Sequence, residues 1–164
     1  MTKIRTRNAD EIDFSYDVLG RLIQKAPDGM PTVSYEYDLA GRRTKVSTAG
    51  VSGNPASGDF DYYYDTAGRL TKEEWPDNKT VQYQYDDNGN VTRVTYPDSY
   101  YVERVFDEIN RLTGIKLNGA TALALEFEYD KLSRRTKLTY ENGVETDYGF
   151  QLDNDMEALI QTLR

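Results

Sequence analysis

The sequence predicts an all-β protein built from seven consecutive antiparallel β-hairpin repeats that form one curled, spiralling sheet. Three observations predict this fold. A Tyr-Asp turn motif recurs along the chain, apolar and polar residues alternate before each copy, and clusters of turn-forming residues follow each copy. Because the repeats fill all 164 residues, an ordinary length for one domain, we predict a single repeat domain over residues 1–164.

An aromatic residue at near-constant spacing marks each repeat. Successive copies lie 21, 27, 21, 21, 23 and 21 residues apart, at Tyr16, Tyr37, Tyr64, Tyr85, Phe106, Tyr129 and Phe150. A regular period of this length is the signature of a repeat architecture.

An outgoing strand, the first strand of each hairpin, is predicted just before each of these aromatic residues. Apolar side chains stand two and four positions before most of them, as Ile12 and Phe14 do, and polar side chains such as Asp13 and Ser15 lie between. A period of two is typical of a strand with one buried face and one face in water.

A hairpin tip follows each aromatic residue, with the pattern Asp-x-x-Gly-Arg. The Asp carboxylate can accept hydrogen bonds from backbone N–H groups two residues on, and Gly or Asn tolerates a positive φ. We therefore predict a type I turn followed by a left-handed residue, with Asp opposite Arg. The residues of this structural turn motif are Tyr16, Asp17, Gly20, Arg21, Tyr37, Asp38, Gly41, Arg42, Tyr64, Asp65, Gly68, Arg69, Tyr85, Asp86, Gly89, Phe106, Asp107, Arg111, Tyr129, Asp130 and Arg134.

A return strand, the second strand of each hairpin, follows each tip. Its apolar residues Val46 and Leu138 are out of step with Leu22 and Leu70, which lie next to their tips. A β-bulge in the return strand would reconcile the two positions. A threonine column marks the start of this strand, at Thr44, Thr71, Thr92, Thr113 and Thr136.

Turn-forming clusters such as WPDNK and YPDSY connect each hairpin to the next. Residues 47–59 are predicted to form one longer, polar loop, which accounts for the spacing of 27 residues. The last repeat, residues 146–164, is degenerate. We expect a strand there, and a short helix capped by Asp153 or Asp155 is the alternative.

Composition excludes several classes of function. The net charge of −8 argues against nucleic acid or an acidic membrane as partner, since phosphate binding needs clustered Lys and Arg. The chain has no Cys and no His, which removes thiolate chemistry and the commonest general base and metal ligand. No apolar run is long enough for membrane insertion, and the first residues lack the apolar core of a secretory signal. We expect no catalytic site, no cofactor and no metal.

Three groups of residues are candidate sites. The acidic cluster at Asp86 to Asn90 resembles a calcium loop but lacks the distal Glu, so turn chemistry explains it better. Glu73 and Glu74 are a poor pair for glycoside hydrolysis, because adjacent strand residues point to opposite faces. Most aromatic rings repeat in two columns and are read as packing. The rings outside these columns form a possible ligand surface, namely Tyr63, Trp75, Tyr100 and Tyr101.

The tips also resemble a known repeat. YDVLGRL, YDLAGRR, YDTAGRL, YDDNGNV, FDEINRL and YDKLSRR are similar to the repeats of the RHS/YD-repeat family. That family includes bacterial rearrangement-hotspot proteins, wall-associated polymorphic toxins, toxin-complex components and the extracellular shells of teneurins. The resemblance covers nearly the whole chain, and six copies are far more specific than a single Tyr-Asp pair.

The resemblance implies a sheet of hairpins that closes into a hollow shell when it is long enough, and in toxin relatives the shell encloses a toxin. Seven repeats would form a partial shell with unpaired edges, and we expect self-association through them. Nothing after Phe150 resembles the self-cleaving end of bacterial shells, so no protease residues are carried over. The chain is expected to be either a segment of a larger protein or a short free-standing relative.

Two functions follow as hypotheses. The first is a non-enzymatic structural module, a segment of an RHS-type β-shell that encloses or scaffolds a toxin or other cargo, with the rest of a larger RHS protein as partner. The second is an extracellular module that binds a glycan or a protein through exposed aromatic rings. In either case the parent protein is expected to be secreted or to lie at the cell surface.

Overall fold

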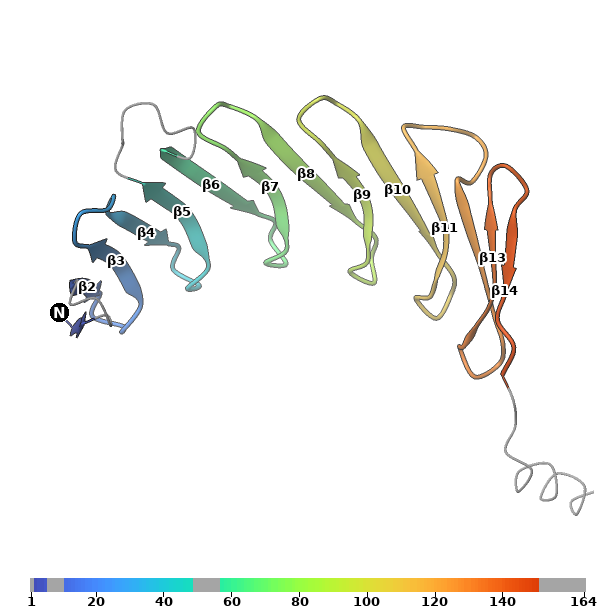
Figure 1. Ribbon diagram of the computed structural model, residues 1–164, viewed down its shortest axis with the longest axis horizontal. Coiled ribbons are helices and arrows are strands. Elements are labelled where there is room, and N and C mark those ends of the chain that lie inside the picture. Colours follow the sequence, from blue (N-terminus) through green and yellow to red (C-terminus); the bar gives the residue numbers. More distant parts are fainter. Residues whose placement is uncertain (1, 6–10, 49–56, 151–164) are drawn as a thin grey trace, which may run out of the picture. The chain divides into compact units, whose positions relative to one another are not determined.

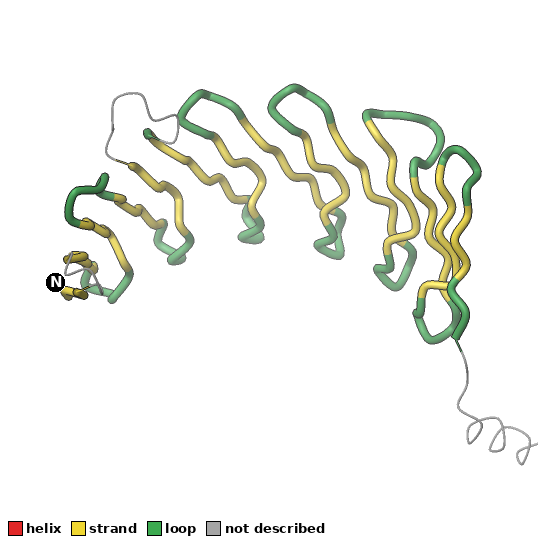
Figure 2. Tube along the Cα trace, in the orientation of Figure 1, coloured by secondary structure: helices red, strands yellow, loops and turns green. Residues whose placement is uncertain are grey.

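The computed structural model describes residues 2–5, 11–48 and 57–150, which contain β-strands, turns and loops but no helix. Figures 1 and 2 show how these elements follow one another. The fourteen strands of the described residues are β1 (Thr2–Arg5), β2 (Glu11–Tyr16), β3 (Leu22–Pro27), β4 (Val33–Tyr37), β5 (Arg43–Thr48), β6 (Gly58–Tyr64), β7 (Leu70–Glu74), β8 (Thr80–Tyr85), β9 (Val91–Thr95), β10 (Tyr101–Phe106), β11 (Leu112–Leu117), β12 (Leu125–Tyr129), β13 (Arg135–Tyr140) and β14 (Glu145–Asp147).

The strands form one open antiparallel sheet whose order follows the chain from β1 to β14. The predicted all-β fold of consecutive hairpins is therefore confirmed. The chain divides into two compact units, residues 1–84 with 93–100 and residues 85–92 with 101–164, so that β9 belongs partly to each. Within each unit the Tyr-Asp tips lie at one end of the strands and the connecting turns lie at the other end (Figure 1).

A β-bulge interrupts the return strand next to the tip. In the first hairpin Ser15 stands opposite Gln24, but Tyr16 stands opposite Leu22, so the intervening Ile23 has no partner across the ladder. The same register shift leaves out one residue in four further hairpins, at Thr44, Thr71, Thr113 and Thr136. The predicted bulge is confirmed, and it explains why the apolar residues on either side of it are out of step.

One face of the sheet, the aromatic face, gathers the apolar side chains, because residues opposite each other in neighbouring strands project from the same side. The register places on it Phe14, Tyr35, Val46, Phe60 and Tyr62 in the first unit and Ile115, Leu125, Phe127 and Leu138 in the second.

The other face, the polar face, is crossed by ion pairs. Lys45 Nζ lies 2.8 Å from Asp59 Oδ2 and 3.4 Å from Asp61 Oδ1, and Lys137 Nζ lies 3.0 Å from Glu145 Oε2. These pairs are exposed or half-exposed, so each contributes little to stability on its own.

The core is thin. Within the described ranges the only buried hydrophobic side chains are Val81, Val94 and Phe127, with 7–8 % of their surface exposed. Most rings of the predicted columns are half-buried, as Tyr37 and Tyr129 are. A single-layer sheet covers its rings only with their neighbours, so the aromatic face stays accessible.

Parts of two predictions lie outside the described residues. They are residues 49–56 of the longer loop and residues 151–164 of the last repeat, for which a strand is predicted with a short helix as the alternative. Over the described residues, the structure contains no helix that is both long and apolar enough to cross a membrane.

Candidate functional site

Each hairpin tip is held by hydrogen bonds between its Asp and the backbone. In the first hairpin Asp17 N donates to Arg21 O at 2.9 Å and Gly20 N donates to Asp17 O at 3.0 Å. The carboxylate Oδ1 of Asp17 accepts from Leu19 N and from Arg21 N, both at 2.9 Å. Gly20 has a φ of +78°. These are the bonds of a type I turn followed by a left-handed residue.

The same backbone pair of hydrogen bonds recurs at the five later tips. The left-handed position is taken there by Gly41, Gly68, Gly89, Asn110 and Ser133, all with positive φ. Asn and Ser therefore replace Gly at two tips without changing the turn.

An ion pair closes five of the six tips. Arg Nε lies 2.6–2.7 Å from Asp Oδ2 in the pairs Arg21–Asp17, Arg42–Asp38, Arg69–Asp65, Arg111–Asp107 and Arg134–Asp130. At the remaining tip Asn90 Nδ2 donates to Asp86 Oδ2 at 2.9 Å. Backbone N–H donation from Arg21 holds the pKa of Asp17 below its ordinary value. The same cause lowers the pKa of Asp65, Asp107 and Asp130.

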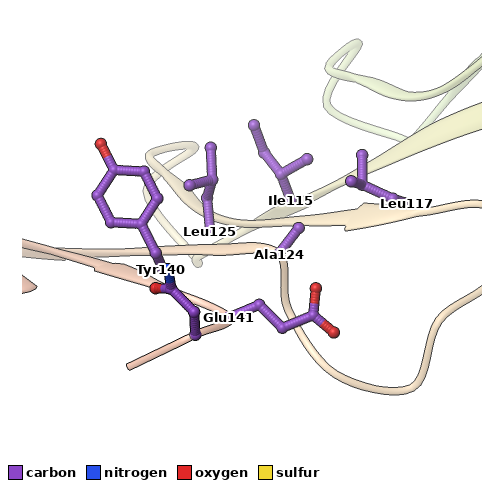
Figure 3. A pocket seen from close by; sticks show the side chains of 7 residues that line it. Ile115, Leu117, Ala124, Leu125, Tyr140 and Glu141 are labelled. Atoms are coloured by element: carbon purple, nitrogen blue, oxygen red, sulfur yellow. The ribbon is translucent and has the colours of Figure 1, made fainter. Parts of the chain in front are cut away.

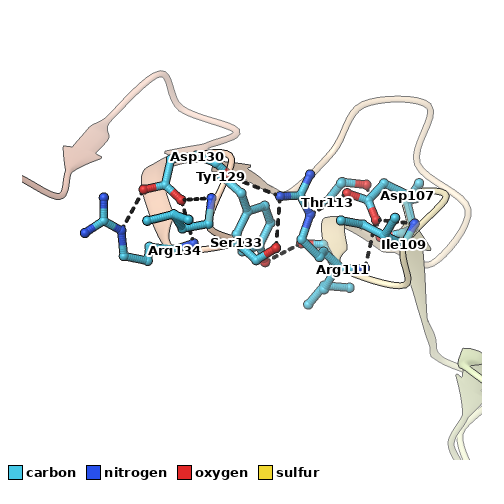
Figure 4. A network of polar contacts seen from close by, with 11 residues as sticks. Asp107, Ile109, Arg111, Thr113, Tyr129, Asp130, Ser133 and Arg134 are labelled. Carbon is cyan, nitrogen blue, oxygen red and sulfur yellow. Dashed lines mark hydrogen bonds and ion pairs between the residues drawn. The ribbon is translucent and has the colours of Figure 1, made fainter. Parts of the chain in front are cut away.

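The tip arginine also contacts the next hairpin. Arg21 Nη1 donates to Asp38 O at 3.0 Å, and its guanidinium lies 4.8 Å from the centre of the Tyr37 ring. Arg111 repeats both contacts, with Asp130 O at 3.2 Å and the Tyr129 ring at 4.9 Å (Figure 4). A planar guanidinium can stack on a ring and still donate at its edge, which an ammonium group cannot do.

The tyrosine of the next hairpin completes the contact. Its hydroxyl donates back to the first carbonyl of the preceding return strand. The distances are 2.8 Å from Tyr37 to Leu22 O, 2.8 Å from Tyr64 to Arg43 O and 2.7 Å from Tyr129 to Leu112 O. We call this set of contacts the tip clasp: Arg to its own Asp, Arg on the next Tyr ring and the next Asp carbonyl, and Tyr back to the return strand.

One junction lacks the clasp on both sides. Asn90 stands where the other tips of its unit have Arg, and the next aromatic is Phe106, which has no hydroxyl. Asn90 Nδ2 instead donates to Asn110 Oδ1 at 2.8 Å. A single amide hydrogen bond therefore takes the place of a stacked, charged contact.

The sequence reasoning placed Tyr, Asp, Gly and Arg within single hairpins and missed that Arg and Tyr join successive ones. The sequence did contain a signal for this contact. The tip that has Asn90 in place of Arg is followed by the tip that has Phe106 in place of Tyr, so both partners of the contact are replaced together. The sequence reasoning also missed the role of the threonine column. Thr71 Oγ1 donates to Tyr63 O and Thr113 Oγ1 to Val105 O, both at 3.2 Å, so the bulge residue bonds to the facing outgoing strand.

The four aromatic residues of the possible ligand surface lie on different strands and turns. Tyr63 projects from the polar face of β6, 43 % exposed, with Lys72 Nζ 3.8 Å from its ring centre. Trp75 and Tyr100 lie in the turns after β7 and β9, each 37 % exposed. Tyr101 belongs to the other unit, begins β10 and is half-buried.

A shallow apolar pocket of about 510 Å³ lies on the second unit, between β11 and the turn after β13. Figure 3 shows Ile115, Leu117, Ala124, Leu125, Tyr140 and Glu141 of its lining, and Asn142 completes the lining. Glu141 is the single ionisable carboxylate in this lining, so the pocket lacks the pair of acids that glycoside hydrolysis requires.

The acidic candidates serve local structure. Asp86 Oδ1 accepts from Asn90 N at 2.8 Å, as in the other tips. Glu73 Oε1 accepts from the hydroxyl of Tyr83 at 3.1 Å, whereas Glu74 Oε2 accepts from Lys72 Nζ at 2.8 Å on the polar face. Across the part of the chain that the structure describes, no three acidic residues are grouped so as to hold a metal ion.

Three solved structures share the fold of this chain. The crystal structure of TcdB2-TccC3-Cdc42 aligns with a TM-score of 0.67 and 14 % identity over 89 % of this chain and 9 % of that chain. TcdB2-TccC3 gives 0.65 and 15 % over 82 % and 7 %, and the Photorhabdus luminescens Tc holotoxin pore gives 0.51 and 13 % over 91 % and 10 %. The chain thus spans about a tenth or less of the length of these proteins.

The open sheet of clasped hairpins defines the chain as a β-hairpin repeat protein. Residues 16–50 and 64–100 match the family described as RHS Repeat. The chain therefore contains RHS repeats at these two places. No curated protein sequence matches it.

Proposed function

We propose that the chain is a segment of an RHS-type wall that scaffolds or encloses a polypeptide cargo such as a toxin, and that it has no enzymatic activity of its own. The parent protein would be secreted or lie at the cell surface. The relatives named TcdB2-TccC3 and Tc holotoxin support a place within a larger assembly.

The accessible aromatic face is the observation that carries this proposal. Rings and aliphatic side chains line one face of the sheet, yet Val81, Val94 and Phe127 alone are buried among the described hydrophobic residues. An accessible apolar face of this kind fits an unfolded chain, which presents apolar side chains without a fixed shape.

The distribution of charge also supports the aromatic face as the side that would meet a cargo. Most carboxylates outside the tips project from the polar face, as Asp59, Asp61 and Glu74 do, and are neutralised there by lysines. The aromatic face carries Arg43 and Arg135, each stacked on a ring of that face, 5.4 Å from Tyr35 and 4.7 Å from Phe127. A cargo on this face would meet mainly rings and guanidinium groups, together with the carboxylate of Glu73, which stands opposite Tyr62.

Binding of an unfolded protein tests the proposal. Fluorescence anisotropy should show that the chain binds labelled, carboxymethylated α-lactalbumin, which stays unfolded, and that the double variant Leu117→Ser and Tyr140→Ser binds it severalfold more weakly. These two residues line the pocket and are exposed on the aromatic face, Tyr140 by 40 %.

The matched control lies on the polar face. Tyr63 and Val105 are exposed to a similar extent, by 43 % and 39 %, so the double variant Tyr63→Ser and Val105→Ser should bind like the wild type. Equal weakening by both double variants, or no binding by the wild-type chain, would contradict the proposal. Specific glycan binding that depends on Trp75 or Tyr100 would favour the carbohydrate-binding hypothesis instead.

A further inference from the structure

The dipeptide Asn-Gly occurs three times in the chain, at Asn88-Gly89, Asn118-Gly119 and Asn142-Gly143. All three pairs are exposed, and each lies in a tight turn. Asparagine loses its side-chain amide most readily when glycine follows it, because glycine has no side chain to hinder attack by its own nitrogen. The three pairs therefore share the same local reactivity, and they differ in the turns that hold them.

The reaction, deamidation, forms one bond and breaks another at the asparagine side chain. The backbone nitrogen of the glycine attacks Cγ of the asparagine, the Cγ–Nδ2 bond breaks, and ammonia leaves with the proton that the attacking nitrogen gives up. Water then opens the succinimide ring at either carbonyl, which yields aspartate or isoaspartate. Because the attacking nitrogen must lose its proton, a hydrogen bond that it donates slows the reaction.

Two of the three turns hold the attacking nitrogen. Gly89 N donates to Asp86 O at 3.1 Å, and Gly143 N donates to Tyr140 O at 2.8 Å. In each case glycine is the fourth residue of the turn, so its N–H is the donor that closes it. Attack by either nitrogen therefore requires the turn to open first.

The remaining turn holds Asn-Gly in a different register. Asn118 and Gly119 are its two central residues, with φ of +47° and +76°. Ala120 N closes the turn by donating to Leu117 O at 3.0 Å. Two central residues with positive φ define a type I′ turn, in which the closing donor is the fourth residue and not the glycine. Among the described residues, Gly119 N accordingly has no hydrogen-bond acceptor.

The segment after this turn is irregular. Residues 120–124 belong to no strand, whereas β9 and β14 begin two residues after the glycine of the other two turns. Ring closure requires rotation about the Cα–C bond of the asparagine, and a strand ladder close to the turn resists that rotation. Asn142 is restrained further, because its Oδ1 accepts from Val144 N at 3.0 Å.

We propose that Asn118 is the main site of spontaneous deamidation in this protein, with aspartate and isoaspartate as products. The inference does not depend on the proposed scaffold function. Conversion adds a carboxylate to the turn after β11 and, in isoaspartate, a methylene group to its backbone. Leu117, the preceding residue, lines the apolar pocket of the second unit, so the new charge appears beside the rim of that pocket.

Peptide mapping by mass spectrometry tests the proposal. One sample of the full chain is kept in native buffer at mildly alkaline pH, and a second is kept at the same pH in guanidinium chloride, which removes the turns. In the unfolded chain the three sites should react at similar rates, because each has the same Asn-Gly sequence. In the folded chain Asn118 should keep most of its unfolded rate, whereas Asn88 and Asn142 should slow severalfold, as expected for one hydrogen bond that must break.

The order of the three sites decides the outcome. The proposal is supported if Asn118 reacts fastest in the folded chain and also has the highest ratio of folded to unfolded rate. Any other order overturns it, including a folded order that only repeats the order found in guanidinium chloride.

Two matched variants give an independent readout. Asn118→Gly removes the amide but keeps a residue that accepts positive φ, and Asn88→Ala is the control, since Ala67 has the same position in another tip. Isoaspartate in aged protein is measured by methyl transfer with protein isoaspartate methyltransferase. Asn118→Gly should lose most of the signal of the wild type and Asn88→Ala should lose little. Equal loss in both folded variants, checked by circular dichroism, would contradict the proposal.

Discussion

The guanidinium groups of four tip arginines, Arg21, Arg42, Arg111 and Arg134, each touch two hairpins, and this explains the residue type. Arg111 Nε binds Asp107 of its own tip while Nη1 reaches Asp130 O and the plane lies over Tyr129. Lysine could neutralise the aspartate but could not stack and donate in fixed directions at once. The clasp therefore depends on the shape of arginine as well as on its charge.

Gly68→Val should destabilise the chain by about 1 kcal/mol or more, because the φ of +86° at this position resists a β-branched side chain. Urea unfolding measures the effect. Gly68→Asn should cost much less, since Asn110 has the same position and a φ of +64°. Lys79→Ala, in the exposed turn after β7, should change little. Equal stability of the Val and Asn variants would contradict the turn described here.

Tyr129→Phe should lower the free energy of unfolding by about 0.5–1.5 kcal/mol, because it removes only the hydroxyl that donates to Leu112 O at 2.7 Å. Tyr140→Phe is the control, since no hydrogen bond of its hydroxyl is found among the described residues and the side chain is 40 % exposed. Thermal or urea unfolding compares the two. If both variants match the wild type, the hydroxyl contact between hairpins contributes nothing to stability.

At the level of elements, the hairpins differ in how firmly they are joined. Three described junctions, those after Arg21, Arg42 and Arg111, combine an arginine that stacks on the next ring with a tyrosine that bonds back, whereas the junction between Asn90 and Phe106 has neither. At the tip that carries Phe106, an amide hydrogen bond therefore takes the place of the stacked, charged contact.

The double substitution Asn90→Arg and Phe106→Tyr should install the missing clasp. Each single change supplies half of the contact, so the double variant should be more stable than the sum of the two single variants by about 0.5–1 kcal/mol. A double-mutant cycle in urea measures this coupling. Additive effects would mean that the clasp geometry of the other junctions does not extend to this one.

For the molecule as a whole, the thin core makes polar contacts unusually important to stability. Tip carboxylates such as Asp17 and Asp65 have pKa values below the ordinary one because backbone N–H groups of Arg donate to them. A carboxyl whose folded pKa is below its unfolded value of about 3.9 stabilises the fold above that pH. The contribution disappears as the pH falls through the folded pKa.

Stability should therefore be nearly constant from about pH 5 to 7 and fall below about pH 4, as the tips protonate. Urea midpoints measured across this range test the prediction. Asp130→Asn keeps the turn acceptor but cannot titrate, so its stability should depend less on pH than that of the wild type. An identical pH profile for both proteins would exclude a contribution from this tip.

Much of the fold could be predicted because the sequence signals for it lie within short stretches of the chain. Each signal lies within one hairpin. The alternation around Phe14 predicts a strand, Asp17 predicts a turn, and the position of Val46, out of step with the residue next to its tip, predicts a bulge. The clasp was missed because it joins residues such as Arg21 and Tyr37 across a junction, where spacing alone does not show which side chains meet.

The place of β1 in the repeat could not be predicted for a different reason. Tip aromatics mark the repeats, and the residues of β1 do not follow one in the sequence. The letters Thr2-Lys3-Ile4 already matched the return strands, but only the pairing of Lys3 with Asp13 shows which position of the repeat they hold. The accessibility of the aromatic face could not be predicted either. The alternation of apolar and polar residues shows which face of a strand is apolar, but it does not show whether another part of the protein covers that face.

Each clasp spans only adjacent hairpins, with partners 15 to 23 positions apart in the sequence. Every such junction uses equivalent parts in an equivalent register, so a gene of this kind can gain or lose one whole period by unequal recombination and still encode matching neighbours. The length of the protein is consequently an adjustable quantity in evolution, while its joints stay the same.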